Sequence, residues 1–202
     1  MYYLILDSMA LQSNISVDRC DWTGTPQLMI DYHDHEWGVP VHDDTKHFEF
    51  LVLDAFQAGL SWSTVLKKRE AFRAAFAGFN VHEVAQFQPA DVDRLMNDAS
   101  IIRNRSKIEA TIRNANAFIG VQAGYGAFDK FIWQFTGYKT IHNHWQTLKE
   151  IPAVSPEAEA MSKALKSNGF YFVGPTICYA YMQAAGMVND HVVGCFRHAQ
   201  LM

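Results

Sequence analysis

The stretch Tyr32–Trp62, YHDHEWGVPVHDDTKHFEFLVLDAFQAGLSW, decides the fold that we predict for this chain. Its second half predicts a buried helix, because apolar and polar side chains recur there at helical spacing. Asp43 or Asp44 can cap this helix at its N-terminus, and Gly59 can end it. The residues at that spacing are Phe48, Phe50, Leu51, Leu53, Asp54 and Gln57.

Asp54 differs in kind from its neighbours, because an ionised carboxylate among apolar residues is costly without a partner. Either it bonds a backbone amide, which would be a structural role, or its partner is a bound molecule. Single aromatic residues are more often core than ligand platform. A buried carboxylate beside several of them nevertheless suits a pocket for a flat cationic ring, and we favour that interpretation. The aromatic candidates are Trp22, Tyr32, Trp37 and Trp62.

Composition places the chain among globular proteins, with 49% hydrophobic and 19% charged residues in a length of 202. We predict one domain over residues 18–202, made of two helical lobes, after a flexible extension at residues 1–17. Three cysteines, an odd count, argue against a disulfide framework and favour the cytoplasm. The net charge of −4 requires any binding of DNA to use a local basic patch. No apolar run is long enough for a membrane span, and we expect a monomer.

Helical patterns dominate the remainder, and the predicted fold class is all-α. Ser106 and Glu109 match a capping box, which predicts the start of one of these helices. Only Phe170–Val173 alternates like a strand, and it is too short to build a sheet. Residues 136–156 are the least regular and are expected to be a surface connection. Helices are expected at residues 61–76, 81–87, 89–97, 106–120 and 157–168, with a last long one starting at Gly174 and Pro175.

Two cysteines and two histidines at the ends of the chain are candidate metal ligands. Cys20 and His33 lie near the start, and His191 and Cys195 lie near the end, where a helix would place them on one face. Such a set suits a tetrahedral, structural zinc site with no open position. The alternative is a buried free cysteine beside unrelated histidines. A metal here would join the two ends of the domain, where loop-closure entropy is large.

Two predicted helices, residues 89–97 and 106–120, are joined by a tight turn with a basic edge. The amides of the turn and the positive end of the second helix make a site for a phosphate. An ordinary solvated turn is the alternative. Glycine is often required in such a turn, and Ser100 stands at that position. The basic residues are Arg103, Arg105, Lys107 and Arg113.

Five blocks of sequence, in this order, closely resemble 3-methyladenine DNA glycosylase I, the bacterial Tag-type family. The resemblance runs from Cys20 to about Cys195 and leaves out residues 1–17 and 136–156. The blocks are YHDHEWGVP at 32–40, QAGLSW-x-TVLKKRE at 57–70, IIRNR-x-KIEA at 101–110, GF-x-FVGPTICY at 169–179 and VNDHVVGC at 188–195.

The resemblance implies an all-α helix-hairpin-helix DNA glycosylase fold with a structural zinc. It implies removal of 3-methyladenine from alkylated double-stranded DNA by hydrolysis of the N-glycosidic bond, which leaves an abasic site. The family's zinc ligands fall on Cys20, His33, His191 and Cys195. Its base-binding residues fall on Tyr32 and Trp62, with Trp22 and Trp37 at further aromatic positions of the pocket. Its DNA-gripping hairpin falls on Asn97–Lys107, with Ser100, Arg103, Arg105 and Lys107 as the candidate DNA contacts.

One departure concerns the catalytic candidate. The family typically carries glutamate where this chain has Asp54, and a Gly-Gln or similar small-polar pair is expected next, where this chain has Ala55 and Phe56. Aspartate is one methylene shorter, so contact with the base requires a shift or a bridging water. The alternative function is therefore a helix-hairpin-helix DNA-binding protein that has lost excision or changed its specificity.

Overall fold

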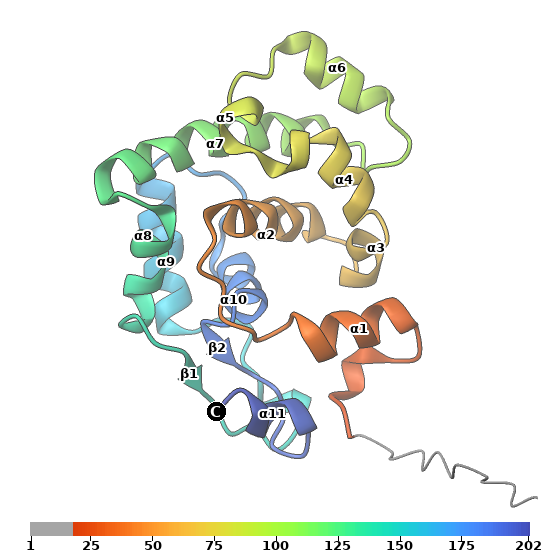
Figure 1. Cartoon of the computed structure of the whole chain (residues 1–202), viewed down its shortest axis with the longest axis vertical. Helices are drawn as coiled ribbons and strands as arrows, with labels where there is room; N and C mark the ends of the chain where they lie inside the picture. Colours follow the sequence, from red (N-terminus) through yellow and green to blue (C-terminus); the bar gives the residue numbers. More distant parts are fainter. Residues whose placement is uncertain (1–17) are drawn as a thin grey trace, which may run out of the picture.

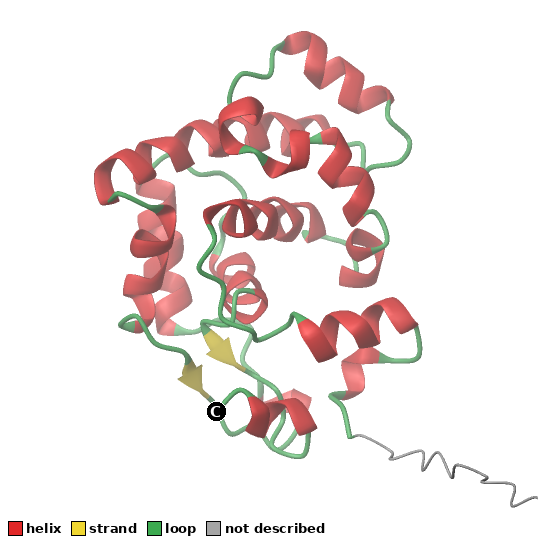
Figure 2. Cartoon of the chain, viewed as in Figure 1, coloured by secondary structure: helices red, strands yellow, loops and turns green. Residues whose placement is uncertain are grey.

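The computed structural model describes residues 18–202, and the predicted extension at residues 1–17 lies outside them (Figure 1). Helices make up most of the described residues, in agreement with the all-α prediction (Figure 2). The α-helices are α1 (Gln27–His35), α2 (Asp44–Gln57), α3 (Trp62–Leu66), α4 (Arg69–Ala75), α5 (Val81–Val84), α6 (Pro89–Asn97), α7 (Arg105–Tyr125), α8 (Phe128–Trp133), α9 (Pro156–Ser167), α10 (Pro175–Ala184) and α11 (Phe196–Gln200). The 3-10 helices are η1 (Asp21–Thr23), η2 (Ala77–Phe79), η3 (Gln134–Thr136) and η4 (Leu148–Glu150).

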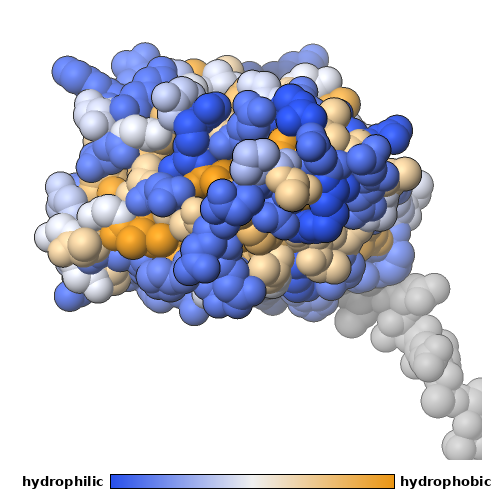
Figure 3. Space-filling view, turned by 90° about the horizontal axis from the view of Figure 1, so that it is seen from above, coloured by the Kyte–Doolittle hydropathy of each residue, from blue (hydrophilic) through white to orange (hydrophobic). Residues whose placement is uncertain are grey.

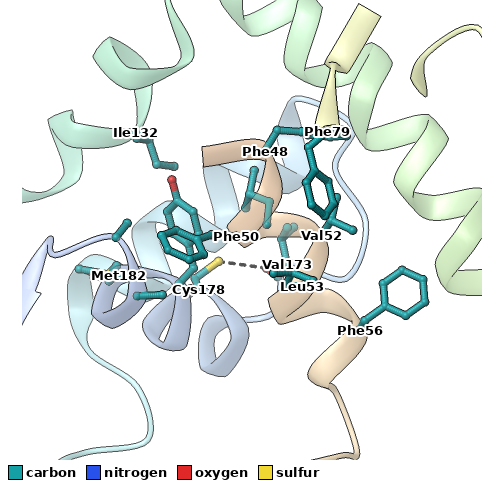
Figure 4. Packing of buried hydrophobic residues seen from close by; sticks show 14 of the residues in the cluster. Phe48, Phe50, Val52, Leu53, Phe56, Phe79, Ile132, Val173, Cys178 and Met182 are labelled. Atoms are coloured by element: carbon teal, nitrogen blue, oxygen red, sulfur yellow. Dashed lines mark hydrogen bonds between the residues drawn. The ribbon is translucent and has the colours of Figure 1, made fainter. Parts of the chain in front are cut away.

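Helix α2 runs through the middle of the molecule and contacts α3, α7, α8 and α10 (Figure 1). Asp43 caps it, because its side chain accepts a hydrogen bond from the amide of Lys46 at 2.8 Å. Every residue of α2 from His47 to Phe56 is buried. Figure 4 shows apolar side chains of α2 packed against α10 and its neighbours. The central stretch therefore forms the core helix that its spacing predicts.

Two strands of two residues each occur in the described part of the chain, at positions that the sequence did not indicate. β1 (Ile141–His142) pairs in parallel with β2 (Val188–Asn189). The predicted strand candidate, Phe170–Val173, is not a strand. Pairing of β1 and β2 holds the irregular segment at residues 136–156 against the C-terminal region.

Three predicted helices differ from the observed ones. The helix expected at residues 81–87 is shorter, because α5 ends at Val84. Residues 61–76 form α3 and α4 with a break at Lys68, whose φ of −103° and ψ of 2° are not helical. The break turns Arg69 inward, to pair with Glu36 and Glu49 at 2.8 Å. Helix α7 begins at Arg105, because Asn104 is its cap and its side chain accepts from the amide of Lys107, the third residue of the helix. The predicted capping box at Ser106 is therefore wrong.

The segment that holds His191 and Cys195 is also different from its prediction. It is a turn that precedes α11, closed by a 2.8 Å hydrogen bond from the amide of Cys195 to the carbonyl of Val192. The two side chains converge through this turn and not through a helical repeat.

The surface seen from the side of α6 is mainly hydrophilic, with small apolar areas between polar side chains (Figure 3). Within residues 18–202, no helix combines the length and the apolar character that crossing a membrane requires.

Candidate functional site

A cavity of about 630 Å³ opens between α1, α2, α3 and α10, and we call it the pocket. This volume lies within the usual range of small-molecule sites. All five residues that the sequence predicted for a base pocket line it. They are Trp22, Tyr32, Trp37, Asp54 and Trp62.

The Asp54 side chain has no partner for one of its oxygens. The residue is 2% exposed, and its Oδ2 atom makes no hydrogen bond within the described residues. Burial therefore raises the pKa of the Asp54 carboxyl well above its ordinary value. An unpartnered buried polar group costs stability, and one that lines a cavity is a candidate ligand contact. The sequence also allowed a structural role for Asp54, in which it would bond a backbone amide, but Oδ2 makes no such bond among the described residues.

The aromatic side chains form a continuous wall. The Tyr32 and Trp62 rings lie 5.1 Å apart at 47°, and the Trp22 and Trp37 rings lie 5.0 Å apart edge to face. The indole Nε1 atoms of Trp22 and Trp62 are buried without a partner among the described residues, like Oδ2 of Asp54. The pocket thus holds two unpaired donors and one unpaired acceptor, next to several π faces. This combination suits a flat, polar heterocycle.

The four predicted metal ligands come together at one point behind the pocket. All are buried, and their ligand atoms lie within 4.8 Å of one another. Tetrahedral zinc with Zn–S of about 2.3 Å and Zn–N of about 2.0 Å requires ligand separations of about 3.3–3.8 Å. The separations fit: His33 Nε2 to His191 Nδ1 is 3.2 Å, and Cys195 Sγ to those two atoms is 3.4 and 3.5 Å. Cys20 Sγ lies 3.7 Å from His191 Nδ1.

The second nitrogen of each histidine is also engaged, as metal-bound histidines require. His33 Nδ1 lies 2.7 Å from Asp34 Oδ1, and His191 Nε2 lies 3.0 Å from the carbonyl of Trp37. The hydrogen bond between the two thiols lowers the pKa of Cys195 and raises the pKa of Cys20, so it favours a thiolate at Cys195 and a thiol at Cys20. The cluster can therefore hold a metal ion with no open position.

The cluster and the pocket share a wall. The ring of Trp37 lies 4.6 Å from the ring of His191, and the ring of Trp22 lies 5.3 Å from that of His33. A metal at the cluster would hold these two indoles in place through its histidines.

The turn between α6 and α7, residues 98–104, is the predicted phosphate site. Arg103 and Arg105 are exposed there, and Arg105 pairs with Asp93 at 2.7 Å. The carboxylate of Asp98 accepts from the Ser100 amide at 2.8 Å, which engages one amide that the prediction left to a phosphate. The amides of residues 101–104 donate to no group in the described part of the chain.

Lys107 is placed differently from its prediction as a DNA contact. It is 7% exposed, and its ammonium donates to the carbonyls of Phe56 and Ala58 at 2.9 and 2.8 Å. Burial also lowers the pKa of Lys107. It lies on the face of α7 that packs against α2, so its charge is directed into the protein and not toward solvent.

The sequence did not identify the far wall of the pocket. Leu148 and the residues Ile151–Ala153 line it, from the segment that was expected to be a surface connection. From α10, Tyr179 and Gln183 line it as well. The periodicity of apolar residues gives no prediction for an irregular segment. Pairing of β1 with β2 is what places this segment beside the pocket. For Tyr179, the block GF-x-FVGPTICY was the available indication.

Comparison with known proteins gives one consistent result. The profile of the Methyladenine glycosylase family matches residues 22–198. DNA-3-methyladenine glycosylase 1 of Escherichia coli K12 is 51% identical over 179 residues, which are 89% of this chain and 96% of that protein. The DNA-3-methyladenine glycosylase of Haemophilus influenzae is 45% identical over 177 residues, 88% of this chain and 96% of that protein.

Solved structures agree with the sequences. A crystal structure of 3-methyladenine DNA glycosylase I has a TM-score of 0.87 at 48% identity and covers 89% of this chain and 98% of its own. A structure of 3-methyladenine DNA glycosylase I from Staphylococcus aureus, solved to explain recognition of 3-methyladenine, has a TM-score of 0.86 at 35% identity. It covers 89% of this chain and 96% of its own.

Proposed function

This chain belongs to the methyladenine glycosylase family, and we propose that it removes 3-methyladenine from alkylated double-stranded DNA. The reaction is hydrolysis of the N-glycosidic bond, and the products are the free base and an abasic site. The enzyme is a monofunctional DNA glycosylase of base-excision repair. We expect it to act as a monomer in the cytoplasm.

The single observation that carries the proposal is the unpartnered Oδ2 atom of Asp54 in an aromatic pocket. Methylation at N3 gives adenine a positive charge while it is still attached to the sugar. Such a base needs π faces and a negative group, and Trp62, Tyr32 and Asp54 supply both. Chemistry on a base in a duplex requires that the base be extruded into a pocket.

Because its pKa is raised, the Asp54 carboxyl is neutral in the empty pocket and ionises when a positively charged base binds. In the empty pocket, burial favours the neutral acid. A cationic base that enters lowers the pKa of the carboxyl, because the ionised form is now paired. The ionised Asp54 then accepts hydrogen bonds from the exocyclic amine. The positive base is itself a good leaving group, so water can attack the sugar carbon without an acid to protonate the base.

DNA is held by the turn at residues 98–104, which with α6 and α7 forms a helix-hairpin-helix element. The free amides of residues 101–104 and the positive end of α7 favour a phosphate, and Arg103 and Arg105 add charge beside them. Ser100 lies at the same turn. We expect this contact to position the duplex, while the pocket identifies the base.

The metal in the cluster is zinc in this proposal, and its role is structural. Two cysteines and two histidines, whose ligand atoms lie within 4.8 Å of one another, are the donors that zinc prefers. The ion would join the N-terminal region at Cys20 to the C-terminal region at Cys195. It would also fix Trp22 and Trp37 through His33 and His191.

The test is release of free base from alkylated duplex DNA, with chromatography to identify the purine. Wild-type enzyme is expected to release 3-methyladenine, and Asp54→Asn to be slower by about 100-fold, the loss typical of removing one electrostatic stabiliser. Asp54→Glu restores the length that the family typically carries and is expected to keep or raise the rate.

Equal rates for wild type and Asp54→Asn would remove Asp54 from the mechanism. Salt-sensitive DNA binding without any base release would support the alternative, a binding protein that has lost excision. The relatives do not favour that alternative, since both of those compared above are named as glycosylases.

A further inference from the structure

A buried lysine connects α7 to the end of the helix that carries Asp54. Lys107 donates to the carbonyls of Phe56 and Ala58, at 2.9 and 2.8 Å. These residues lie at the C-terminus of α2, where carbonyls lack partners within the helix and carry partial negative charge. A single ammonium with three donors satisfies two of them at once. Lys107 therefore attaches the hairpin to the segment that runs from Asp54 into the pocket.

A second lysine makes the reciprocal contact. Lys68 lies at the break between α3, which begins with Trp62, and α4. Its ammonium donates to the carbonyls of Ala99 and Ser100, at 3.2 and 2.7 Å. Both acceptors belong to the turn at residues 98–104. Lys68 therefore attaches the wall of the pocket to the turn that faces DNA.

The two lysines connect the same two parts of the protein, the pocket segment and the hairpin. Lys107 reaches from the hairpin to the end of α2, and Lys68 reaches from the end of α3 to the turn at residues 98–104. Each uses its charge on backbone carbonyls, so neither ammonium serves as a simple phosphate contact. Backbone acceptors also fix the path of the chain, which a contact to a mobile side chain does not do. Together they hold the segment from Asp54 to Trp62 against the turn at residues 98–104.

We propose that Lys68 and Lys107 are positioning residues, which hold the pocket at a fixed distance from the DNA phosphate bound at the turn. This inference rests on the proposed function. A phosphate bound at the turn fixes the duplex, and the extruded nucleotide has a set reach from there. A displacement of the pocket by about 1 Å can cost roughly 100-fold in rate even when the pocket itself is intact.

The test compares Lys68→Met and Lys107→Met with Lys67→Met as the matched control. Methionine keeps the length of the side chain and removes the ammonium. Lys67 is exposed, lies beside Lys68 and makes no hydrogen bond or ion pair with the described residues through its side chain. Three quantities are measured: the single-turnover rate of base release at saturating enzyme, the affinity for the duplex, and the affinity for free 3-methyladenine.

We expect the rate at saturation to fall roughly 10- to 100-fold in Lys68→Met and Lys107→Met, because the reacting groups are misplaced. The affinity for free 3-methyladenine is expected to change by less than about twofold, because the pocket lining is untouched. Lys68→Arg keeps the donors and is expected to recover most of the rate. Lys67→Met is expected to stay within about twofold of wild type, as an exposed charge should.

Two results of these rate and affinity measurements would overturn the proposal. If the variants only bind the duplex more weakly and reach the wild-type rate at saturation, the lysines supply charge and not position. If the variants lose affinity for the free base in proportion to the loss of rate, the two lysines maintain the structure of the pocket and not its distance from the turn. Lys68→Met decides the question if Lys107→Met does not fold.

A second readout separates this proposal from the proposed function. Hydrogen exchange of the amides at residues 57–66 and 98–104 is expected to speed up together in Lys68→Met and to stay unchanged in Lys67→Met. This result does not depend on catalysis. A wild-type protein that releases no base would contradict the proposed function alone, whereas unchanged exchange in Lys68→Met would contradict the positioning role of Lys68.

Discussion

Two buried aspartates lie in different surroundings, one at the pocket and one in the C-terminal region at residues 188–195. Asp54 is 2% exposed and has an oxygen without a partner, whereas Asp190 is 1% exposed and accepts four hydrogen bonds. Burial is therefore the same, and the supply of partners is what differs. The donors to Asp190 are Asn143, Trp145, Tyr179 and Gln183, at 2.7, 2.8, 2.7 and 2.8 Å.

The difference teaches that burial of a charge does not by itself mark a site. Asp190 is complete within the chain: it holds Tyr179 and Gln183 on the wall of the pocket and joins them to the irregular segment. Oδ2 of Asp54 has no hydrogen-bond partner among the described residues, so its partner must come from a bound molecule. Asp190 therefore positions side chains that line the pocket, whereas Asp54 lines the pocket with an oxygen that is free to bind a ligand.

The largest expected effect lies at the Cys/His cluster, whose four buried side chains could hold one metal ion. Cys195→Ala is expected to lose the metal and to lower the free energy of unfolding by about 5 kcal/mol or more, because metal binding there is coupled to folding. Metal content and denaturant unfolding measure both. Cys178→Ala removes the third buried thiol and should keep the metal, at a cost of about 1–2 kcal/mol. A purified wild type that is equally stable with and without a chelator would contradict a structural metal.

Asp190→Asn is expected to come next, with a loss of about 2–4 kcal/mol in the free energy of unfolding. An amide offers one acceptor oxygen, and its NH2 group would face two of the present donors. Asp93→Asn is the control, since Asp93 is an exposed partner of Arg105 and should change stability by less than about 0.5 kcal/mol. Similar values for the two variants would show that the four hydrogen bonds contribute little.

The smallest change in stability, with the opposite sign, is expected for Asp54→Asn. Above pH 3.8 the buried carboxyl must either hold a proton that the unfolded chain loses or stay ionised without a partner, and an amide has neither cost, so the variant should be more stable than wild type by about 1 kcal/mol at neutral pH. The sign follows from the raised pKa of folded Asp54. Below its ordinary value of 3.8 both states hold the proton, and above it the unfolded state loses the proton first.

The stability of wild type relative to Asp54→Asn should therefore fall as the pH rises from about 3.8 to the raised pKa, and then level off. Urea unfolding of both proteins at about pH 4 and about pH 7 measures the difference. A variant that is less stable than wild type at both pH values would mean that Asp54 has a partner within the chain, as Asp190 does.

Much of the fold was predictable, because helical spacing dominates the chain. The core helix α2, its cap Asp43 and the start of α10 after Gly174 follow from local rules of spacing and capping. The break at Lys68 did not follow from them, because the inward pull on Arg69 comes from Glu36 and Glu49 elsewhere in the chain. The turn at His191–Cys195 was mistaken for a helix, since a separation of four fits both.

The candidate site divides in the same way. Residue chemistry indicated Asp54, the aromatic wall and the Cys/His cluster, because each is unusual for its place in the sequence. It did not indicate Leu148 or the direction of Lys107. Their positions depend on pairing of β1 with β2 and on packing of α7 against α2, and both are contacts between distant segments.

The most direct test of the central claim is the affinity of wild type and Asp54→Asn for free 3-methyladenine, measured by quenching of tryptophan fluorescence. If the base supplies the partner that Oδ2 of Asp54 lacks, wild type binds saturably and Asp54→Asn binds at least about tenfold more weakly, the loss expected when a buried hydrogen bond is removed. Equal affinities, in a variant that remains folded, would show that the base is held without Asp54 and would contradict the account.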